Sequence, residues 1–235
     1  MAQELAREDR AVITSVHNLG VAAQYCSRLI LLERGRIAAS GRPEQVLRPD
    51  ILDRVYGIRT LVSPNPITGS MTVSVIPWRA GVTSSRIHLI GGAGSAVNLT
   101  RALYRLGCAL SGGIAHEYDS DEKLWRSLGV ESCCVGAFSP IDEKDVERAV
   151  RLVEAADLTV LCPFPVGTGN LGNLLLAARA GRLVILEPGP GDMPRGFFAE
   201  EGRLAFERLT AGAETMGYEQ LISALKRGTA VSGSD

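Results

Sequence analysis

The chain has 235 residues, 46% of them hydrophobic, which is enough for buried cores in one large or two small domains. Its 25 basic and 26 acidic residues leave a formal net charge of -1, so there is no global attraction to nucleic acid or to anionic lipid. An odd count of five cysteines without a Cys-x-x-Cys pair argues against a disulfide framework and favours a reducing compartment such as the cytoplasm.

The first elements along the chain predict a strand that ends in a histidine. Residues 11–16 are apolar and lead directly to His17, and such a side chain at the C-terminal end of a strand is typical of a nucleotide-sensing position in an α/β sheet. A short helix over 21–26 follows, then a hairpin that turns at Gly35. After it come the helix start Gly-Arg-Pro-Glu-Gln-Val and the segment Ile-Leu-Asp-Arg-Val-Tyr-Gly.

This succession resembles the C-terminal part of the ATP-binding subunit of an ABC transporter, most closely the importers of iron-siderophore, haem and cobalamin. In that family a switch histidine precedes a helix, a leucine-rich strand, a Gly-Arg hairpin turn and a Gly-x-Pro-x-x-Val helix start. The resemblance covers about residues 1–78, including the tail Pro-Asn-Pro-Ile-Thr-Gly at 64–69. Two positions depart from the family pattern, since Asn18 and Ser27 stand where the family usually has aspartate.

The resemblance implies a P-loop NTPase fold for this segment, with His17 as the catalytic residue that contacts the γ-phosphate of ATP. It also implies membrane permease subunits and a second ATPase subunit as partners, and a cytoplasmic location at the inner face of the cell membrane. No apolar run of the sequence approaches the roughly 20 residues that span a bilayer. We therefore expect any membrane association to go through a protein partner.

The motifs that bind and cleave ATP do not occur in these residues. A triphosphate is held by Gly-x-x-x-x-Gly-Lys-Ser/Thr, and the sequence contains neither this run nor a Leu-Ser-Gly-Gly-Gln-like signature. No apolar strand ending in Asp-Glu precedes His17 either. We therefore expect a truncated gene product or a fragment that hydrolyses no ATP alone, with ATP and Mg²⁺ as cofactors only of an intact family member.

A stretch rich in proline and glycine marks the best domain boundary. It interrupts the periodic pattern, apart from the alternating segment 71–76, which predicts an edge strand. The sequence thus divides into an ABC ATPase segment over 1–62, a linker over 63–83, an accessory domain over 84–228 and a polar, disordered tail over 229–235.

The accessory domain alternates strands, glycine loops and helices, which predicts a parallel sheet between two helical layers, a three-layer Rossmann-like α/β domain. Five strand-and-helix units are expected. The predicted strands cover 86–90, 108–112, 132–135, 158–162 and 183–186. The predicted helices cover 95–106, 142–156, 171–180 and 218–226, and one more helix is expected through Leu124, Trp125 and Leu128. Over about residues 86–190 the sequence also resembles an extra C-terminal domain of some siderophore and cobalamin importer ATPases, which implies location and association more than activity.

Two glycine loops are candidate binding sites, because ligands of open α/β sheets collect at the carboxyl ends of the strands. The first loop follows the first strand and leads into a helix, whose N-terminal backbone amides would point toward a ligand bound there. It is therefore either a phosphate or nucleotide site or a plain tight turn. The second loop follows the fourth strand, where the two asparagines are expected to face a cleft, although Asn170 alone has a second interpretation as a helix cap. The candidate ligand-binding residues of these two loops are Gly91, Gly92, Gly94, Ser95, Gly167, Thr168, Gly169, Asn170 and Asn173.

The loop after the second strand gathers acidic residues around His116. Asp119 and Asp121 in this loop are further ligand-binding candidates, and such a cluster can act in acid–base chemistry or bind a metal. A solvated loop with a helix cap at Ser120 or Asp121 is the interpretation that we favour, and we predict no metal site because no second His-rich segment completes a ligand set. His88, within the first strand, is expected to be a packed core residue.

Three functions are compatible with these patterns. The accessory domain can be a sensor of a nucleotide or of the imported metal complex, an enzyme on a nucleotide or sugar-phosphate, or a structural interaction module. Carboxylates that converge on the glycine loops would favour catalysis, whereas carboxylates turned to solvent would favour sensing. A structural module predicts filled, apolar loop surfaces.

Overall fold

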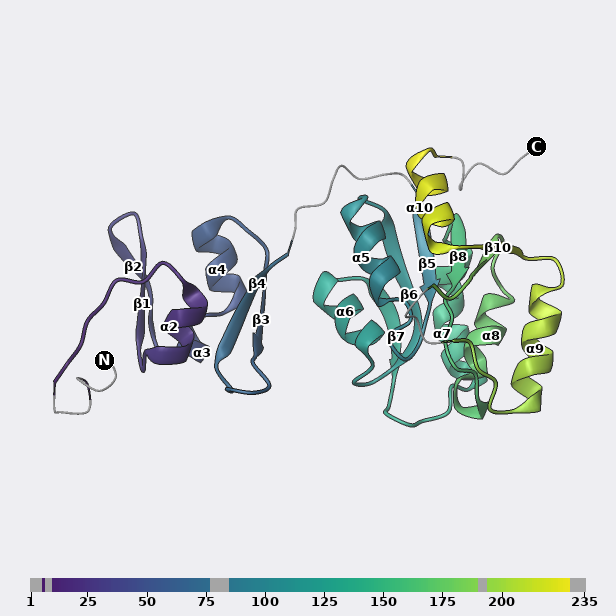
Figure 1. Cartoon of the computed structure of the whole chain (residues 1–235), viewed down its shortest axis with the longest axis horizontal. Helices are drawn as coiled ribbons and strands as arrows, with labels where there is room; N and C mark the ends of the chain where they lie inside the picture. Colours follow the sequence, from purple (N-terminus) through teal and green to yellow (C-terminus); the bar gives the residue numbers. More distant parts are fainter. Residues whose placement is uncertain (1–5, 7–9, 77–84, 190–193, 229–235) are drawn as a thin grey trace. The chain divides into compact units, whose positions relative to one another are not determined.

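A computed structural model of the chain describes residues 6, 10–76, 85–189 and 194–228. The chain divides into two compact units, Met1–Trp78 and Arg79–Asp235 (Figure 1). The predicted tail over 229–235 and residues 77–83 of the predicted linker lie outside the described residues. The rest of the predicted linker, residues 63–76, belongs to the first unit and contains most of a strand hairpin, so the first unit extends beyond the predicted boundary at residue 62. Each unit has its own buried apolar cluster, so we describe the two units separately.

From Leu19 to Val75 the first unit contains two antiparallel hairpins and three short helices. Its β1–β2 turn consists of Arg34 and Gly35, both with positive φ, which is the geometry of a two-residue type I′ hairpin turn. The expected turn at Gly35 is therefore confirmed. The elements are α2 (Leu19–Tyr25), β1 (Leu29–Glu33), β2 (Arg36–Gly41), α3 (Pro43–Val46), α4 (Pro49–Tyr56), β3 (Thr60–Pro64) and β4 (Met71–Val75).

The expected strand over residues 11–16 is absent from the structure. These residues have no regular secondary structure and are largely exposed, with Ile13 at 96% exposure. A strand needs a neighbour to pair its backbone groups, and the described strands of this unit pair only within their own hairpins. His17 is exposed and lies just before Asn18, which caps α2 through a 3.0 Å hydrogen bond from the Val21 amide.

The β1–β2 hairpin presents aliphatic side chains on its outward face. Ile30, Leu32 and Ile37 are 62%, 63% and 65% exposed, and Leu32 pairs directly with Ile37 across the hairpin. Between them Leu31 points inward and is buried. We call Ile30, Leu32 and Ile37 the outward hairpin face, and such a continuous apolar surface is typical of a strand pair that another layer of protein covers.

The second unit is built on six parallel strands, each followed by a helix. The strand order is β10-β9-β8-β5-β6-β7, so the chain runs outward from β5 to β7 and then crosses back to place β8 beside β5. The strands are β5 (Arg86–Ile90), β6 (Ala109–His116), β7 (Glu131–Val135), β8 (Leu158–Leu161), β9 (Leu183–Leu186) and β10 (Glu214–Met216). The prediction of an α/β fold with a parallel sheet is confirmed. The strand order reverses between β5 and β8, which is the topological switch point of the sheet.

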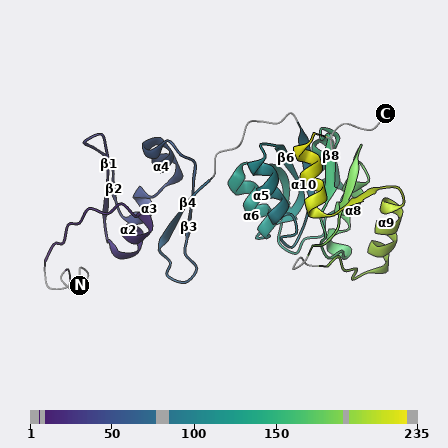
Figure 2. The same ribbon diagram turned by 45° about the horizontal axis from the view of Figure 1, so that its top comes forward.

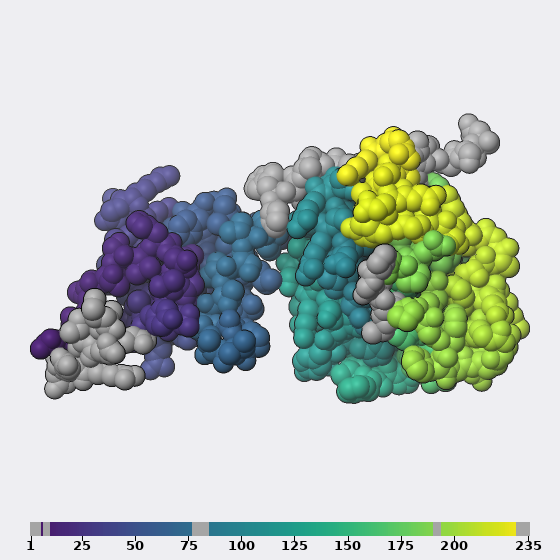
Figure 3. Space-filling model, viewed as in Figure 1, coloured from purple at the N-terminus to yellow at the C-terminus, as the bar shows by residue number. Residues whose placement is uncertain are grey.

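Helices cover both faces of this sheet. On one face, α5, α6 and α10 pack on a core that includes Leu99, Trp125 and Leu221. On the other face, α7, α8 and α9 pack on a core that includes Val146 and Leu174. Figures 1 and 2 show α5 and α6 on one side of the strands and α8 and α9 on the other, and Figure 3 shows α10 beside α5. The helices are α5 (Val97–Arg105), α6 (Ser120–Leu128), α7 (Glu143–Glu154), α8 (Gly172–Ala177), α9 (Glu200–Thr210) and α10 (Tyr218–Lys226).

Strand β6 is longer than the sequence predicted and continues through two glycines to His116. A Cβ atom at Gly112 would lie 2.5 Å from Cε3 of Trp125, so the absence of a side chain lets the indole ring pack on the strand. The two glycines therefore belong to a strand and not to a loop. The five predicted strands all form, and α9 and β10 are additional elements that the sequence analysis did not predict.

Candidate functional site at the carboxyl edge of the sheet

The loop after β5, residues 91–96, is the first of the two predicted glycine loops, and we call it the glycine loop. Ala93 and Gly94 both adopt positive φ, 54° and 80°, which turns consecutive amides toward the same side. The Gly92 amide donates to Oγ of Ser95 at 3.3 Å. The loop therefore has the compact shape of an anion-binding turn at the start of α5.

The anion that meets these amides is a carboxylate of the chain itself. Asp119, which precedes α6, accepts hydrogen bonds from the amides of Ala93 at 2.7 Å and of Gly94 at 3.3 Å. The same carboxylate accepts from the Asp121 amide at 2.8 Å and thereby caps α6. One side chain thus satisfies two amides of the glycine loop and one amide in the first turn of α6.

Asp121 lies deeper than Asp119, at 0% exposure. Its Oδ1 accepts a 3.0 Å hydrogen bond from the Ala96 amide, while its Oδ2 is buried and, within the described residues, has no hydrogen-bond partner. Burial, followed by repulsion from Asp119, raises the pKa of Asp121 to about 7, and the backbone N–H groups of Ala96, Gly92 and Gly94 act in the opposite direction. Asp121 therefore titrates near neutral pH.

The predicted helix cap in this segment is one residue away from its expected place. The sequence analysis assigned the cap to Ser120 or Asp121, whereas Asp119 is the capping residue. The structure brings the predicted acidic residues Asp119 and Asp121 together with the predicted glycine loop, which the spacing in the sequence alone does not show.

The second predicted loop is closed by its own asparagine. Oδ1 of Asn170 accepts from the Gly167 amide at 2.8 Å, and its Nδ2 donates to the Pro165 carbonyl at 2.8 Å. Thr168 and Gly169, in the short 3-10 turn η1 (Thr168–Asn170), are exposed. Asn170 therefore holds its own loop together, but it is not the cap of α8, whose N-cap residue is Leu171 without a side-chain hydrogen bond.

Asn173 does not share a cleft with Asn170, so the expectation that both face one cleft is wrong. It lies in the first turn of α8 at 2% exposure, and its Nδ2 donates to the Ile114 carbonyl of β6 at 3.0 Å. Gly172, just before it, packs so closely on Ile141 that a Cβ atom would lie 2.4 Å from Cγ2 of that residue. The close approach of α8 to its neighbours directs the amide of Asn173 inward.

The point where the sheet reverses its order is filled by an aromatic ring. A Cβ atom at Gly92 would lie 3.6 Å from Cγ of Phe164, and Phe164 is buried. Next to it, Nη2 of Arg195 lies 3.3 Å from the carbonyls of Leu161, Cys162 and Leu186, at the ends of β8 and β9. The sequence analysis did not identify Arg195 as a site residue. The one feature that could have pointed to it is a single basic residue in the stretch rich in proline and glycine after the fifth predicted strand.

The two histidines of this unit have structural contacts. Nε2 of His116 lies 2.8 Å from the Ser139 carbonyl and ties the end of β6 to the loop after β7. His88 is buried as expected, its Nδ1 lies 2.8 Å from Oγ of Ser111, and burial lowers its pKa to about 3. Among the described residues, no group of three or more His, Cys, Asp or Glu side chains could hold a metal ion.

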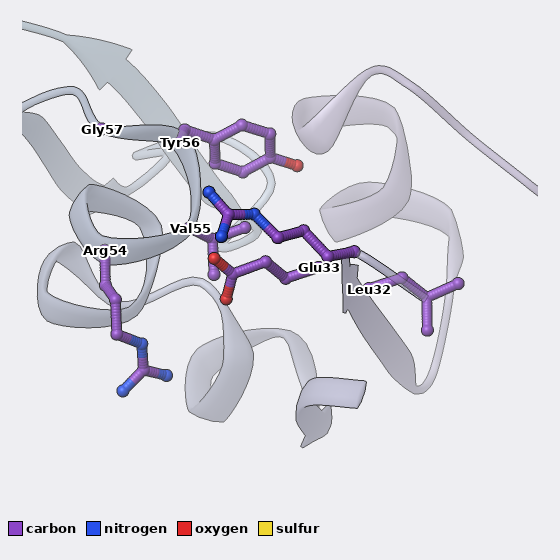
Figure 4. Close-up of a pocket in the computed structure, with 7 residues that line it drawn as sticks. Leu32, Glu33, Arg54, Val55, Tyr56 and Gly57 are labelled. Carbon is purple, nitrogen blue, oxygen red and sulfur yellow. The ribbon is translucent and has the colours of Figure 1, made fainter. Parts of the chain in front are cut away.

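Two hollows of the described surface lie away from the glycine loop. One, of about 430 Å³, is in the second unit at the opposite, amino-terminal edge of β9 and β10. The other, of about 480 Å³, is in the first unit, where it is lined by the end of β1 at Leu32 and Glu33 and by the end of α4 at Tyr56 and Gly57 (Figure 4). No helix in the described part of the chain has the length and apolar character of a membrane span.

Comparisons with known proteins relate both units to importer subunits. The cobalamin import ATP-binding protein BtuD of Halobacterium salinarum is 33% identical over 173 residues, which are 73% of this chain and 44% of that protein. The hemin import ATP-binding proteins HmuV of Photobacterium profundum and Rhodococcus jostii are 47% and 41% identical over 73 residues, 31% of this chain and about a quarter of each protein. The chain thus spans less than half the length of these curated relatives.

The match to BtuD is longer than the whole second unit, so it includes residues of both units. A solved structure of the A domain of a carboxylic acid reductase from Segniliparus rugosus has a TM-score of only 0.27 at 14% identity, which is too low to indicate a shared fold. The model of the MJ0874 family matches residues 110–232, just over half of the chain. The chain therefore belongs to the MJ0874 family.

Proposed function

We propose that this chain is the C-terminal part of the cytoplasmic ATP-binding subunit of an ABC importer for iron-siderophore or cobalamin-type metal complexes. The observation that carries the proposal is the match to a cobalamin import ATP-binding protein across both units. The 235 residues contain no Walker A, signature or Walker B motif. The ATP-binding core, the permease subunits and the second ATPase subunit are then partners of these two units at the inner face of the membrane.

The surface of the first unit supports this proposal. On the outward hairpin face, Ile30, Leu32 and Ile37 remain about two-thirds exposed. Folding normally buries most of the surface of such aliphatic side chains. The exposed residues 11–16 add a second apolar segment without a paired strand in the described structure. Contact with the ATP-binding core would cover both and return His17 to the edge of a sheet.

A fusion protein tests this part of the proposal. The N-terminal part of the Halobacterium relative, joined ahead of this chain, is expected to restore ATP hydrolysis. In that fusion His17→Ala should lower the turnover about 100-fold, the usual size for losing one group that stabilises developing charge. The neighbouring Asn18→Asp change, which restores the residue usual in the family, is the control and should keep activity. A folded fusion without turnover, or one indifferent to His17→Ala, would contradict the proposal.

The second unit is proposed to sense the imported metal complex. Ligands of parallel α/β sheets bind at the carboxyl edge of the sheet, and residues of this unit match the cobalamin import relative in the same alignment as residues of the first unit. Isothermal titration of the whole chain with cobalamin and with haemin is expected to give saturable heat for at least one of them. Titrations free of heat with both compounds would count against a sensor.

A second candidate function is an enzyme on a nucleotide or sugar-phosphate, and one observation favours it. Asp119 and Asp121 do converge on the glycine loop, and the pKa of Asp121, about 7, suits a general acid or base. Against it, Asp121 is fully buried, and Asp119 is bound to three backbone amides. A catalytic group must reach its substrate, so we place this candidate second.

A further inference from the structure

The glycine loop has the backbone of a phosphate site but is occupied from within. Its amides at Ala93, Gly94 and Ala96 all donate to the carboxylates of Asp119 and Asp121. A ligand phosphate would need the same N–H groups, since they are the donors that the loop and the start of α5 direct toward the edge of the sheet. It would therefore compete with side chains that are already in place.

We propose that Asp119 and Asp121 form an internal anion that closes the glycine loop to phosphate-bearing ligands, so that the second unit discriminates against nucleotides. The inference rests on the proposed sensing function, because it names which class of ligand this edge of the sheet rejects. It also makes Asp119 a specificity-determining residue.

The glycines of the loop support this inference independently of the hydrogen bonds. A Cβ atom at Gly91 would lie 2.8 Å from Oδ2 of Asp121, so the missing side chain makes room for that carboxylate. A Cβ atom at Gly94 would meet Cβ of Ser120 at 3.4 Å. Together with the ring of Phe164 on Gly92, each loop glycine faces a side chain of the protein where a phosphate-binding loop needs open space.

The charges act in the same direction. A phosphate carries up to two negative charges and would arrive beside two carboxyl groups, one of them buried at 0% exposure. The carboxylate of Asp119 meets the glycine loop and the N-terminus of α6, while Asp121 accepts from the Ala96 amide at the N-terminus of α5, and helix N-termini attract anions. Displacement of Asp119 would break its hydrogen bonds to the start of α6 and to the glycine loop. The hydrogen bonds that a phosphate forms with the loop would therefore only replace those that Asp119 gives up.

The test measures a gain of binding. Inorganic phosphate and ADP are titrated into the whole wild-type chain and into Asp119→Asn, with the amide NMR signals of Ala93 and Gly94 as the readout. Asparagine is also a good helix cap, so the variant keeps α6 while it removes the negative charge. We expect no saturation for the wild type and an affinity at least tenfold higher for Asp119→Asn.

The matched control is Asp142→Asn, which changes the capping residue of α7, whose Oδ1 accepts from the Asp145 amide at 3.0 Å. It should bind phosphate no better than the wild type. Saturable binding of phosphate at the loop of the wild type, or a folded Asp119→Asn protein that binds no more phosphate than the wild type, would overturn the inference. Failure of the cobalamin and haemin titrations would instead refute only the sensing function.

Discussion

Asp121→Asn is expected to make the second unit less sensitive to pH and more stable than the wild type above neutral pH. Folding raises the pKa of Asp121 from 3.8 to about 7, so the folded state binds this proton more tightly than the unfolded state. The contribution of the protonated group is complete below about pH 4 and is lost as the pH rises through about 7. Asparagine keeps an acceptor for the Ala96 amide and carries no charge.

The size of this effect follows from the two pKa values. Proton linkage makes the wild type lose about 2–3 kcal/mol relative to Asp121→Asn between pH 5 and pH 8. Urea unfolding of both proteins at several pH values, followed by circular dichroism, measures the difference. Asp142→Asn serves as the control for removing one carboxylate from an exposed helix cap of the same unit. A stability difference between wild type and Asp121→Asn that is constant over this range would refute the burial argument.

Gly112→Ala is expected to be the most destabilising small substitution in the sheet. The added Cβ would lie 2.5 Å from Cε3 and 2.7 Å from Cδ2 of Trp125, and 2.9 Å from Cβ of Ser132. The indole ring is fully buried and its Nε1 donates to Oγ1 of Thr100 at 3.0 Å, so it has no room to move aside. Overpacking of this kind costs about 2–3 kcal/mol.

Gly181→Ala provides the matched control for this substitution. In the described structure no atom lies within 4 Å of a Cβ at Gly181, and its φ is not in the left-handed region. It should change the free energy of unfolding by less than about 0.5 kcal/mol. Equal urea midpoints for Gly112→Ala and Gly181→Ala would show that β6 and Trp125 are packed differently from this description.

The sequence predicts the second unit well because its strands are short, apolar and separated by glycine loops. β5, β8 and β9 are buried runs, and α7 has apolar side chains at helical spacing behind a capping aspartate. β10 was missed because it has three residues, and α9 because Gly202 is its only fully buried residue. Elements with so few buried residues carry little periodic signal.

The candidate site is only half predictable from the sequence. The position of the glycine loop follows from the strand before it, since loops at the carboxyl ends of parallel strands share one edge. The pairing of its amides with Asp119 joins residues about 25 positions apart, and no local pattern reports it. The inward turn of Asn173 toward Ile114 likewise depends on the packing of α8 on β6.

The first unit shows that the composition of a strand is not enough to form one without a pairing partner. Residues 11–16 have the composition of a strand, yet their backbone finds no partner in the described structure and stays irregular. The hairpin at Arg34 and Gly35 is formed because its partner strands lie next to each other in the sequence. Strand pairing with distant segments is the information that this stretch of sequence does not contain.

The central claim is that these residues accompany an ATP-binding core but do not contain one. The most direct test is the rate of ATP hydrolysis by the purified chain alone, in the presence of Mg²⁺, compared with that of its His17→Ala variant. The account predicts no hydrolysis above the buffer rate for either protein. Turnover by the unmodified chain that His17→Ala abolishes would contradict it.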